Sequence, residues 1–247
     1  MTHLMAHRGM SAIAPENTLA AFRACKEHGI NWFEFDVGLI ADGSAVVIHD
    51  NTLDRTTDAE GPVEALTAAD LERIDAGSSF SPEFAGERIP TLRQVVDLMN
   101  ELELDANLEI KAGSPRQLIT GVVMTELEQL DPERKVIISS FDPWVLMRVR
   151  GALRRWNRRR RKASVTIAFI SKANAFGRMW HAIGKAIGAT AIHPDVETLD
   201  AAHVARYHRA GFAVNVWTVN DADRARELIE WGVDGLFSDN PHELLGE

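Results

Sequence analysis

The feature that most constrains the fold of this chain is a regular alternation of short apolar segments with amphipathic ones. Eight principal strands are expected, at residues 4–7, 32–37, 105–110, 136–140, 165–170, 190–193, 213–218 and 235–238. Eight alternating strand and helix units in about 250 residues are typical of an α/β protein with a (β/α)8 barrel, or TIM barrel. A doubly wound sheet is the competing arrangement, but the strand count and the absence of a glycine-rich dinucleotide loop count against it.

Helices are expected between these strands. Asn17 and Thr18 are both candidates to cap the first helix, which Gly29 closes, and Pro143 occupies the first turn of a later one. The expected helices are residues 17–28, 91–102, 116–130, 143–156, 176–187, 201–210 and 221–231, with a terminal helix starting at Pro241.

Residues 50–90 interrupt this alternation of strands and helices. A short strand at residues 45–48 precedes them and a short helix is expected at residues 67–74, but residues 75–88 are rich in Gly, Ser, Pro and charge. The segment has too few apolar residues to fold as a domain of its own. We interpret it as a small insertion after strand two, within a single domain of residues 1–247.

Composition excludes several classes of protein. The hydrophobic content is 45% and the charged content 26%, as in soluble globular proteins, and the net charge of −9 argues against nucleic-acid binding. The single cysteine, Cys25, excludes an intramolecular disulfide and a thiolate metal cluster. Neither a leader nor a transmembrane segment is recognisable, so we expect a cytoplasmic protein, either a monomer or a small homo-oligomer.

Two carboxylates share one face of the second strand. Glu34 and Asp36 alternate within an apolar stretch, so they point the same way and are expected to be buried. The alternative is a surface strand with solvated acids. Glu109, at the end of the third strand, adds another oxygen ligand, and three hard carboxylate ligands favour Mg²⁺ or Ca²⁺ over zinc.

Imidazole and cationic side chains also fall at strand ends. His7 and His49 are candidates to share acid and base duties, although a lone histidine is more often a core residue. Arg8 and Lys111 supply fixed positive charge suited to phosphate, and Arg8 can equally neutralise the acids. A metal site, cations and paired imidazoles together indicate phosphodiester cleavage.

The remaining strand-end residues leave alternatives open. Glu16 and Asn17 either shape the start of the first helix or support the site, and Asp50 is expected to pair with Arg55 to brace the insertion. His193 either lies at the mouth of the barrel or only packs near Pro194, and Trp217 is either barrel core or a wall of the substrate site. The basic run 154–162 is interpreted as a solvated helix end, with contact to an anionic membrane as the alternative.

Eight motifs, in order along the chain, resemble those of the glycerophosphodiester phosphodiesterase family, part of the phosphatidylinositol-phospholipase-C-like superfamily. They are His7-Arg8-Gly9, Pro15-Glu16-Asn17-Thr18, Glu34-Phe35-Asp36-Val37, Asp42-Gly43, Val47-Ile48-His49-Asp50, Leu53-Asp54-Arg55-Thr56-Thr57, Glu109-Ile110-Lys111 and Val216-Trp217-Thr218-Val219-Asn220. Each motif is weak alone, but together they cover nearly the whole chain.

This resemblance implies metal-dependent hydrolysis of a glycerophosphodiester to sn-glycerol 3-phosphate and an alcohol. It implies that His7 and His49 are the general acid–base pair, and that Glu34, Asp36 and Glu109 hold Mg²⁺ or Ca²⁺. It further implies that Arg8 and Lys111 contact phosphate and that Phe141 and Trp217 lie near the glycerol. Two routes stay open, direct attack by water and attack by the glycerol hydroxyl through a cyclic phosphate.

Two other functions are weighed against this one. A lysophospholipase D acting on acylated substrates would need an apolar entry groove, for which Phe80, Phe84 and Ile89 of the insertion are candidates. A non-catalytic phosphate-binding scaffold would have no reason to keep the two histidines and three acids together.

Overall fold

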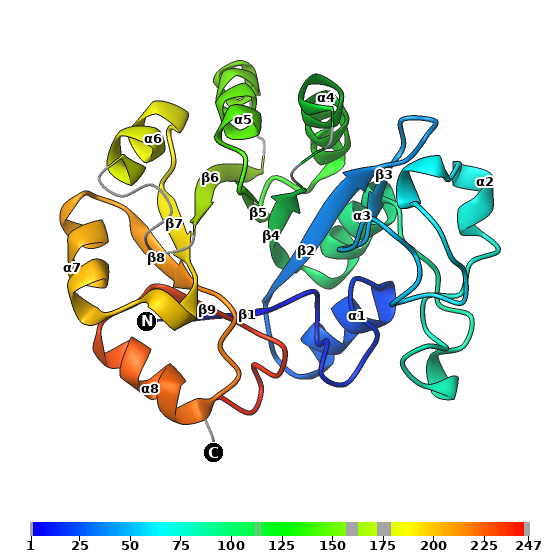
Figure 1. Ribbon diagram of the computed structural model, residues 1–247, viewed down its shortest axis with the longest axis horizontal. Coiled ribbons are helices and arrows are strands. Elements are labelled where there is room, and N and C mark those ends of the chain that lie inside the picture. Colours follow the sequence, from blue (N-terminus) through cyan, green and yellow to red (C-terminus); the bar gives the residue numbers. More distant parts are fainter. Residues whose placement is uncertain (1, 112, 114, 157–162, 172–178, 245–247) are drawn as a thin grey trace.

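The strands of the protein close into a barrel. The computed structural model describes residues 2–111, 113, 115–156, 163–171 and 179–244. Eight parallel strands run in the order β1-β9-β8-β7-β6-β5-β4-β2, and pairing of β1 with β2 closes the ring, which confirms the expected (β/α)8 barrel (Figure 1). The barrel strands are β1 (His3–Ala6), β2 (Trp32–Leu39), β4 (Asp105–Ile110), β5 (Lys135–Ser140), β6 (Ser164–Ser171), β7 (Ala191–Pro194), β8 (Ala213–Val216) and β9 (Gly235–Ser238).

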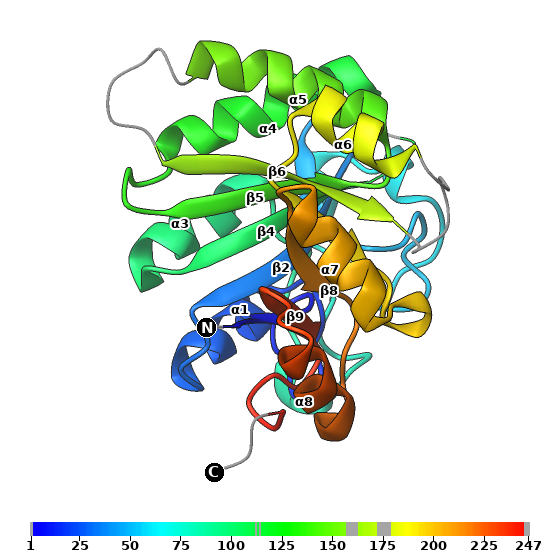
Figure 2. The same ribbon diagram turned by 90° about the vertical axis from the view of Figure 1, so that its left-hand side faces the viewer.

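Helices surround these strands on the outside, as Figures 1 and 2 show. Side-chain caps start several of them: Thr91 and Gln94 form a capping box on α3, and Asp221 accepts the backbone N–H of Arg224 on α8. The helices are α1 (Leu19–Glu27), α2 (Ala68–Leu71), α3 (Leu92–Leu102), α4 (Arg116–Glu126), α5 (Pro143–Trp156), α6 (Trp180–Ile187), α7 (Ala201–Arg209) and α8 (Ala222–Glu230), with 3₁₀ turns at Val63–Ala65, Pro82–Phe84, Leu127–Gln129 and Val196–Thr198.

The main core lies between the helices and the outward face of the barrel. Phe22 of α1 packs on Phe33 of β2, with ring centroids 4.5 Å apart, and both side chains are fully buried. Burial of a large apolar side chain stabilises the fold by about 1.5–3 kcal/mol, so such contacts hold each helix on its strand. Cys25 is also fully buried in this core, as expected.

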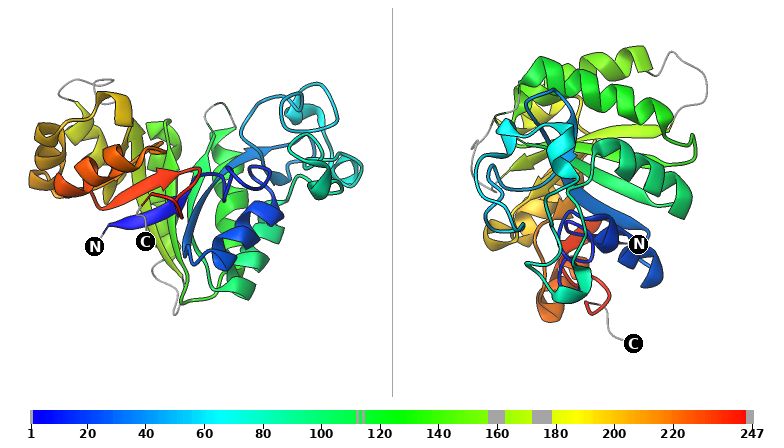
Figure 3. Two further views of the ribbon diagram at one scale, coloured as in Figure 1. Left: turned by 90° about the horizontal axis from the view of Figure 1, so that it is seen from below. Right: turned by 90° about the vertical axis from the view of Figure 1, so that its right-hand side faces the viewer.

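Residues 50–90, the insertion, lie to one side of the barrel (Figure 3, left, cyan). The β3 strand (Ala45–Val47) runs antiparallel to β2, and the insertion packs on this hairpin. A small apolar cluster, separate from the main core, holds it there: Ile40, Val46, Ile48, Leu53, Val63, Leu71, Ile74, Ala76 and Ile89. Asp75 orders the loop at its far end by accepting the backbone N–H groups of Gly77, Ser78 and Gly86.

Several expected helix boundaries were wrong. Thr18, not Asn17, caps α1, because its Oγ1 accepts the N–H of Ala21. The helix expected at residues 67–74 spans only Ala68–Leu71, and residues 241–244 form a turn instead of starting a terminal helix. Of the helix expected at residues 176–187, the described part is α6, since residues 172–178 lie outside the described residues.

The described residues bear on the two membrane-related expectations, a spanning helix and the basic run 154–162. None of their helices combines the length and the apolar character needed to cross a bilayer. Of the basic run 154–162, only the first three residues, at the end of α5, belong to the part of the chain that the structure describes.

Candidate active site

All nine residues singled out in the sequence line one cavity of about 170 Å³ at the carboxyl ends of the barrel strands. This is the end at which (β/α)8 barrels carry their active sites. The nine are His7, Arg8, Glu34, Asp36, His49, Glu109, Lys111, Phe141 and Trp217, and the cavity is also lined by Asn107, Ile170, His193 and Phe237.

The three acids form a compact cluster. Glu34 and Asp36 alternate on β2, and the parallel register pairs Asp36 with Glu109 on β4. One carboxylate oxygen from each of the three lies within 4.8 Å of the other two. Glu34 is 4% and Asp36 is 2% exposed, so the solvated-strand alternative is wrong.

The electrostatics of the cluster are unfavourable without a cation. Burial, together with the neighbouring carboxylates, raises the pKa of Glu34 and of Glu109 above the ordinary range. The pKa of Asp36 is instead lowered despite its burial, because Lys111 and Arg8 lie beside it. The Lys111 Nζ is 3.5 Å from Asp36 Oδ1 and 3.9 Å from Glu109 Oε1. A divalent cation would relieve this repulsion, so the donor set fits a hard metal ion.

Arg8 occupies a tight turn directly after β1. Its φ of 57° is in the left-handed region, which non-glycine residues rarely adopt and which recurs at functional sites. The turn directs its backbone N–H to Glu34 Oε2 at 2.9 Å and its guanidinium Nη1 to Glu16 Oε1 at 2.9 Å. Its buried Nε lies 3.5 Å from Asp36 Oδ2, an ion pair without a hydrogen bond among the described residues.

Gly9 allows this turn to sit against α1. Its φ is 78°, and a Cβ built there would lie 2.7 Å from the Cβ of Ala21. Only a glycine fits both the backbone angle and the contact.

His7 is held by an acid from the other end of the chain. Its Nδ1 lies 2.7 Å from Asp239 Oδ1, and Ser11 and Asn220 donate hydrogen bonds to the same carboxylate. These bonds outweigh burial and lower the pKa of Asp239 to about 2, so it is ionised at neutral pH and can only accept. The Nδ1 of a neutral His7 therefore carries the proton, and its Nε2 is free to accept one.

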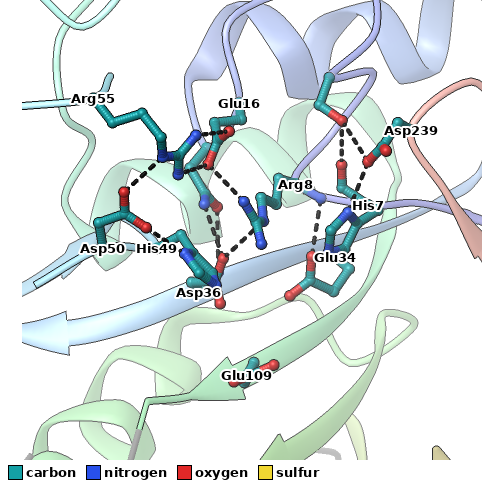
Figure 4. A network of polar contacts seen from close by, with 12 residues as sticks. His7, Arg8, Glu16, Glu34, Asp36, His49, Asp50, Arg55, Glu109 and Asp239 are labelled. Atoms are coloured by element: carbon teal, nitrogen blue, oxygen red, sulfur yellow. Dashed lines mark hydrogen bonds and ion pairs between the residues drawn. The ribbon is translucent and has the colours of Figure 1, made fainter. Parts of the chain in front are cut away.

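His49 has a similar arrangement on a different side of Arg8 (Figure 4). Its Nδ1 lies 2.6 Å from Asp50 Oδ1, and Arg55 donates from Nε to Asp50 Oδ2 at 2.6 Å, which confirms the expected Asp50–Arg55 pair. The hydrogen bond from Arg55 lowers the pKa of Asp50 well below its usual range. Asp50 therefore fixes the tautomer of His49 as Asp239 fixes that of His7.

Two aromatic side chains also line the cavity. Phe141 follows β5 and Trp217 follows β8, and their rings meet edge to face with centroids 5.7 Å apart. The Trp217 indole donates to the backbone oxygen of His193 at 2.9 Å, which fixes the ring. Trp217 is a wall of the cavity and not plain barrel core.

His193 lines the cavity as a buried neutral ring. Burial lowers its pKa to about 3, and its Nε2 lies 3.0 Å from the amide nitrogen of Asn215. This pairing gives it a structural role. Among the described residues, the other histidines do not line the cavity: His3, His28, His181, His203, His208 and His242.

Some supporting residues were anticipated and others were not. Of the two roles expected for Asn17, support of the site is the one observed, because its amide donates to Asp36 Oδ2 at 3.0 Å and its Oδ1 accepts the Asp36 N–H at 3.2 Å. The sequence assigned no role to Asp239. Asn107 was overlooked, although it alternates with Glu109 on β4 and therefore shares its face.

The barrel and the residues at its carboxyl end define the class of (β/α)8 barrel enzymes. The sequence model of the glycerophosphoryl diester phosphodiesterase family matches residues 7–243, and the chain belongs to this family.

Similar proteins cover nearly the whole chain. A glycerophosphodiester phosphodiesterase of Caldanaerobacter subterraneus subsp. tengcongensis is 34% identical over 99% of this chain and 96% of its own. One of Bacillus altitudinis is 31% identical over 99% and 97%. A solved structure of an Oleispira antarctica phosphodiesterase, in complex with the product sn-glycerol 3-phosphate, has 29% identity and a TM-score of 0.90 over 99% of this chain and 95% of its own.

Proposed function

We propose that this protein hydrolyses glycerophosphodiesters to sn-glycerol 3-phosphate and an alcohol. The observation that carries the proposal is the convergence of three acids, two histidines, two cations and two aromatic rings on one cavity. The product in the similar Oleispira antarctica structure supports sn-glycerol 3-phosphate as the product here.

Glu34, Asp36 and Glu109 would hold Mg²⁺ or Ca²⁺. Their oxygens are hard ligands close enough together for one ion, and burial together with the neighbouring carboxylates raises the pKa of Glu34 and Glu109, as at a site where a cation would favour the ionised acids. When bound, such a cation neutralises phosphoryl oxygens and makes the phosphorus easier to attack.

Arg8 and Lys111 are proposed to bind the phosphate. Both side chains line the cavity, and each lies 3.5 Å from a carboxylate oxygen of Asp36. A phosphate bound beside the acid cluster would therefore lie close to two positive charges.

His7 and His49 are proposed to act as base and acid. Each ring is held through Nδ1 by a carboxylate, which leaves Nε2 for proton transfer, and the two rings lie apart on different sides of Arg8 (Figure 4). His7 takes a proton from the attacking oxygen, that of water or of the glycerol hydroxyl, as this oxygen bonds to phosphorus. His49 gives a proton to the alcohol oxygen as its bond to phosphorus breaks. On the second route the product is a cyclic phosphate, which water then opens to sn-glycerol 3-phosphate. Phe141 and Trp217 provide an apolar wall for the carbon atoms of the glycerol.

Release of glycerol 3-phosphate from glycerophosphocholine tests this function. We expect release with added Mg²⁺ or Ca²⁺ and none with EDTA. Absence of cation-dependent release from any glycerophosphodiester would leave the scaffold alternative. Activity confined to acylated substrates would favour the lysophospholipase D alternative. The groove expected for it is not observed among the described residues, because none of Phe80, Phe84 and Ile89 lines the cavity and Ile89 is buried in the insertion.

A further inference from the structure

The side chain of Arg55 connects the insertion to two residues of the cavity at once. Arg55 lies in the insertion, 47% exposed, and does not line the cavity among the described residues. Its guanidinium nevertheless makes three hydrogen bonds, which lead in two directions toward the site (Figure 4).

One direction leads to His49. Arg55 Nε donates to Asp50 Oδ2 at 2.6 Å, and Asp50 Oδ1 lies 2.6 Å from Nδ1 of His49. Asp50 thus binds the guanidinium with one oxygen and the imidazole with the other. Rotation of the carboxylate away from either partner would break both bonds, so the position of Arg55 sets the orientation of the His49 ring.

The other direction leads to Arg8. Arg55 donates from Nη1 to Glu16 Oε2 at 2.7 Å and from Nη2 to Glu16 Oε1 at 2.9 Å, a bidentate pair. Glu16 Oε1 also accepts from Nη1 of Arg8 at 2.9 Å. Glu16 belongs to the loop between β1 and α1, so these bonds tie that loop to the insertion across a small cavity of about 130 Å³.

The contacts act more on geometry than on stability. Ion pairs that are this exposed contribute only about 0–1 kcal/mol to folding, whereas a planar, bidentate guanidinium pair fixes both partners in direction. Burial disfavours the ionised Glu16, yet its pKa is lowered because Arg55 and Arg8 share it. Both cations are therefore held by one ionised carboxylate.

We propose that Arg55 is a positioning residue, which aligns His49 through Asp50 and Arg8 through Glu16 when the insertion is seated on the barrel. The inference rests on the proposed function, in which His49 protonates the departing alcohol and Arg8 binds the phosphate. A lysine cannot replace the guanidinium, because an ammonium ion is a point charge without the planar fork that reaches Asp50 and Glu16 together.

Leaving-group dependence separates positioning of His49 from a general structural defect. Glycerophosphocholine releases an alcohol that needs a proton, whereas the 4-nitrophenyl diester of glycerol 3-phosphate releases a phenolate that leaves without one. Single-turnover rates are measured on both substrates, with cation present, for Arg55→Met, Arg55→Lys and His49→Ala. Arg73→Met is the matched control, because Arg73 is an exposed arginine of the insertion away from the cavity.

We expect Arg55→Met to slow glycerophosphocholine cleavage by about 10- to 100-fold, the usual effect of removing an orienting partner, and to slow the 4-nitrophenyl substrate clearly less. Arg55→Lys should show the same preference with a smaller loss. Arg73→Met should match the wild type on both substrates, and thermal unfolding should leave the midpoint of the Arg55 variants near that of Arg73→Met.

Three results would overturn the inference. They are equal losses on the two substrates for Arg55→Met, full activity of Arg55→Lys, and a loss for Arg73→Met as large as that for Arg55→Met. His49→Ala separates this failure from that of the proposed function. If His49→Ala shows no preference for the 4-nitrophenyl substrate, the acid role of His49 fails. If it shows the preference and Arg55→Met does not, the positioning role alone fails.

Discussion

Asp36 on β2 and Glu109 on β4 are direct partners in the parallel register of the two strands, and their carboxylates join that of Glu34 in one cluster. Three acids are thus brought together by adjacent strands whose backbones hydrogen-bond to each other. The three carboxylates lie close together without a bound cation, so their mutual repulsion should affect the stability of the protein.

The first prediction concerns pH and the cation. The pKa of Glu109 is raised to about 8 and that of Glu34 is also raised, so without a cation the folded state holds more protons than the unfolded state above about pH 4.5. The stability of the EDTA-treated protein should therefore fall as the pH rises toward 8. Mg²⁺ or Ca²⁺ should raise the thermal midpoint more at about pH 8 than at about pH 5, since ligands must lose protons to bind.

Glu109→Gln tests whether the acid cluster causes this pH-dependent response to the cation. The variant should lose most of the pH-dependent response to cation, whereas Glu64→Gln, an exposed change in the insertion, should keep it. An equal midpoint shift at both pH values in the wild type would contradict the prediction.

The second prediction concerns the partner of His7. Asp239→Asn removes the negative charge that keeps the proton on Nδ1, so kcat should fall by about 10- to 100-fold. KM should change little, because Asp239 is outside the cavity lining among the described residues. Asp234→Asn is the matched control, since Asp234 binds His208 Nε2 at 2.9 Å far from the site. A similar fall in kcat for both variants would rule out a specific role.

The third prediction concerns the aromatic wall. Phe141→Ala removes the edge-to-face partner of Trp217 and part of the apolar surface, so KM should rise by about 2- to 10-fold, as expected for about 0.5–1.5 kcal/mol. The change in kcat should be small if the ring binds substrate and transition state alike. Trp144→Ala, at a neighbouring ring that is 63% exposed and outside the described cavity lining, should leave KM unchanged. A large fall in kcat with constant KM would contradict this role.

The fourth prediction concerns the turn after β1. Gly9→Ala meets both a left-handed backbone angle and a contact of 2.7 Å to Ala21, so it should reduce stability by more than about 2 kcal/mol and displace Arg8. Gly43→Ala is a matched control, because its φ is 85° but no atom lies within 4 Å of the added Cβ. It should lower the free energy of unfolding only by the cost of the left-handed backbone angle, about 1–2 kcal/mol. Chemical denaturation of both variants checks the difference, and equal losses would mean that the close approach to α1 carries no cost.

The barrel and the nine cavity residues could be predicted because both follow from local rules. Alternation within a strand places Glu34 beside Asp36, and parallel strands deliver their carboxyl ends to one side of the barrel. Glu109 could be added as the third acid because it ends the next barrel strand, and the observed register pairs it directly with Asp36.

The supporting residues could not be predicted in this way. Whether Asn17 caps a helix or holds Asp36 depends on its φ of 59°, which turns its side chain from α1 toward β2. Asp239 pairs with His7 only through closure of the barrel, and Glu16 meets Arg55 only through the seating of the insertion. Each is a contact between segments far apart in sequence, where propensity and periodicity carry no signal.

The hydrogen bond between His7 and Asp239 can form only late in the synthesis of the chain. The two residues are 232 positions apart, on the first strand and directly after the last one, which pair with each other in the ring. A ribosome must therefore deliver nearly the entire domain before the imidazole gains its carboxylate. A nascent chain that already contains the three acids would still lack the carboxylate that orients His7, so under the proposed mechanism the base would be aligned only once β9 has joined the ring.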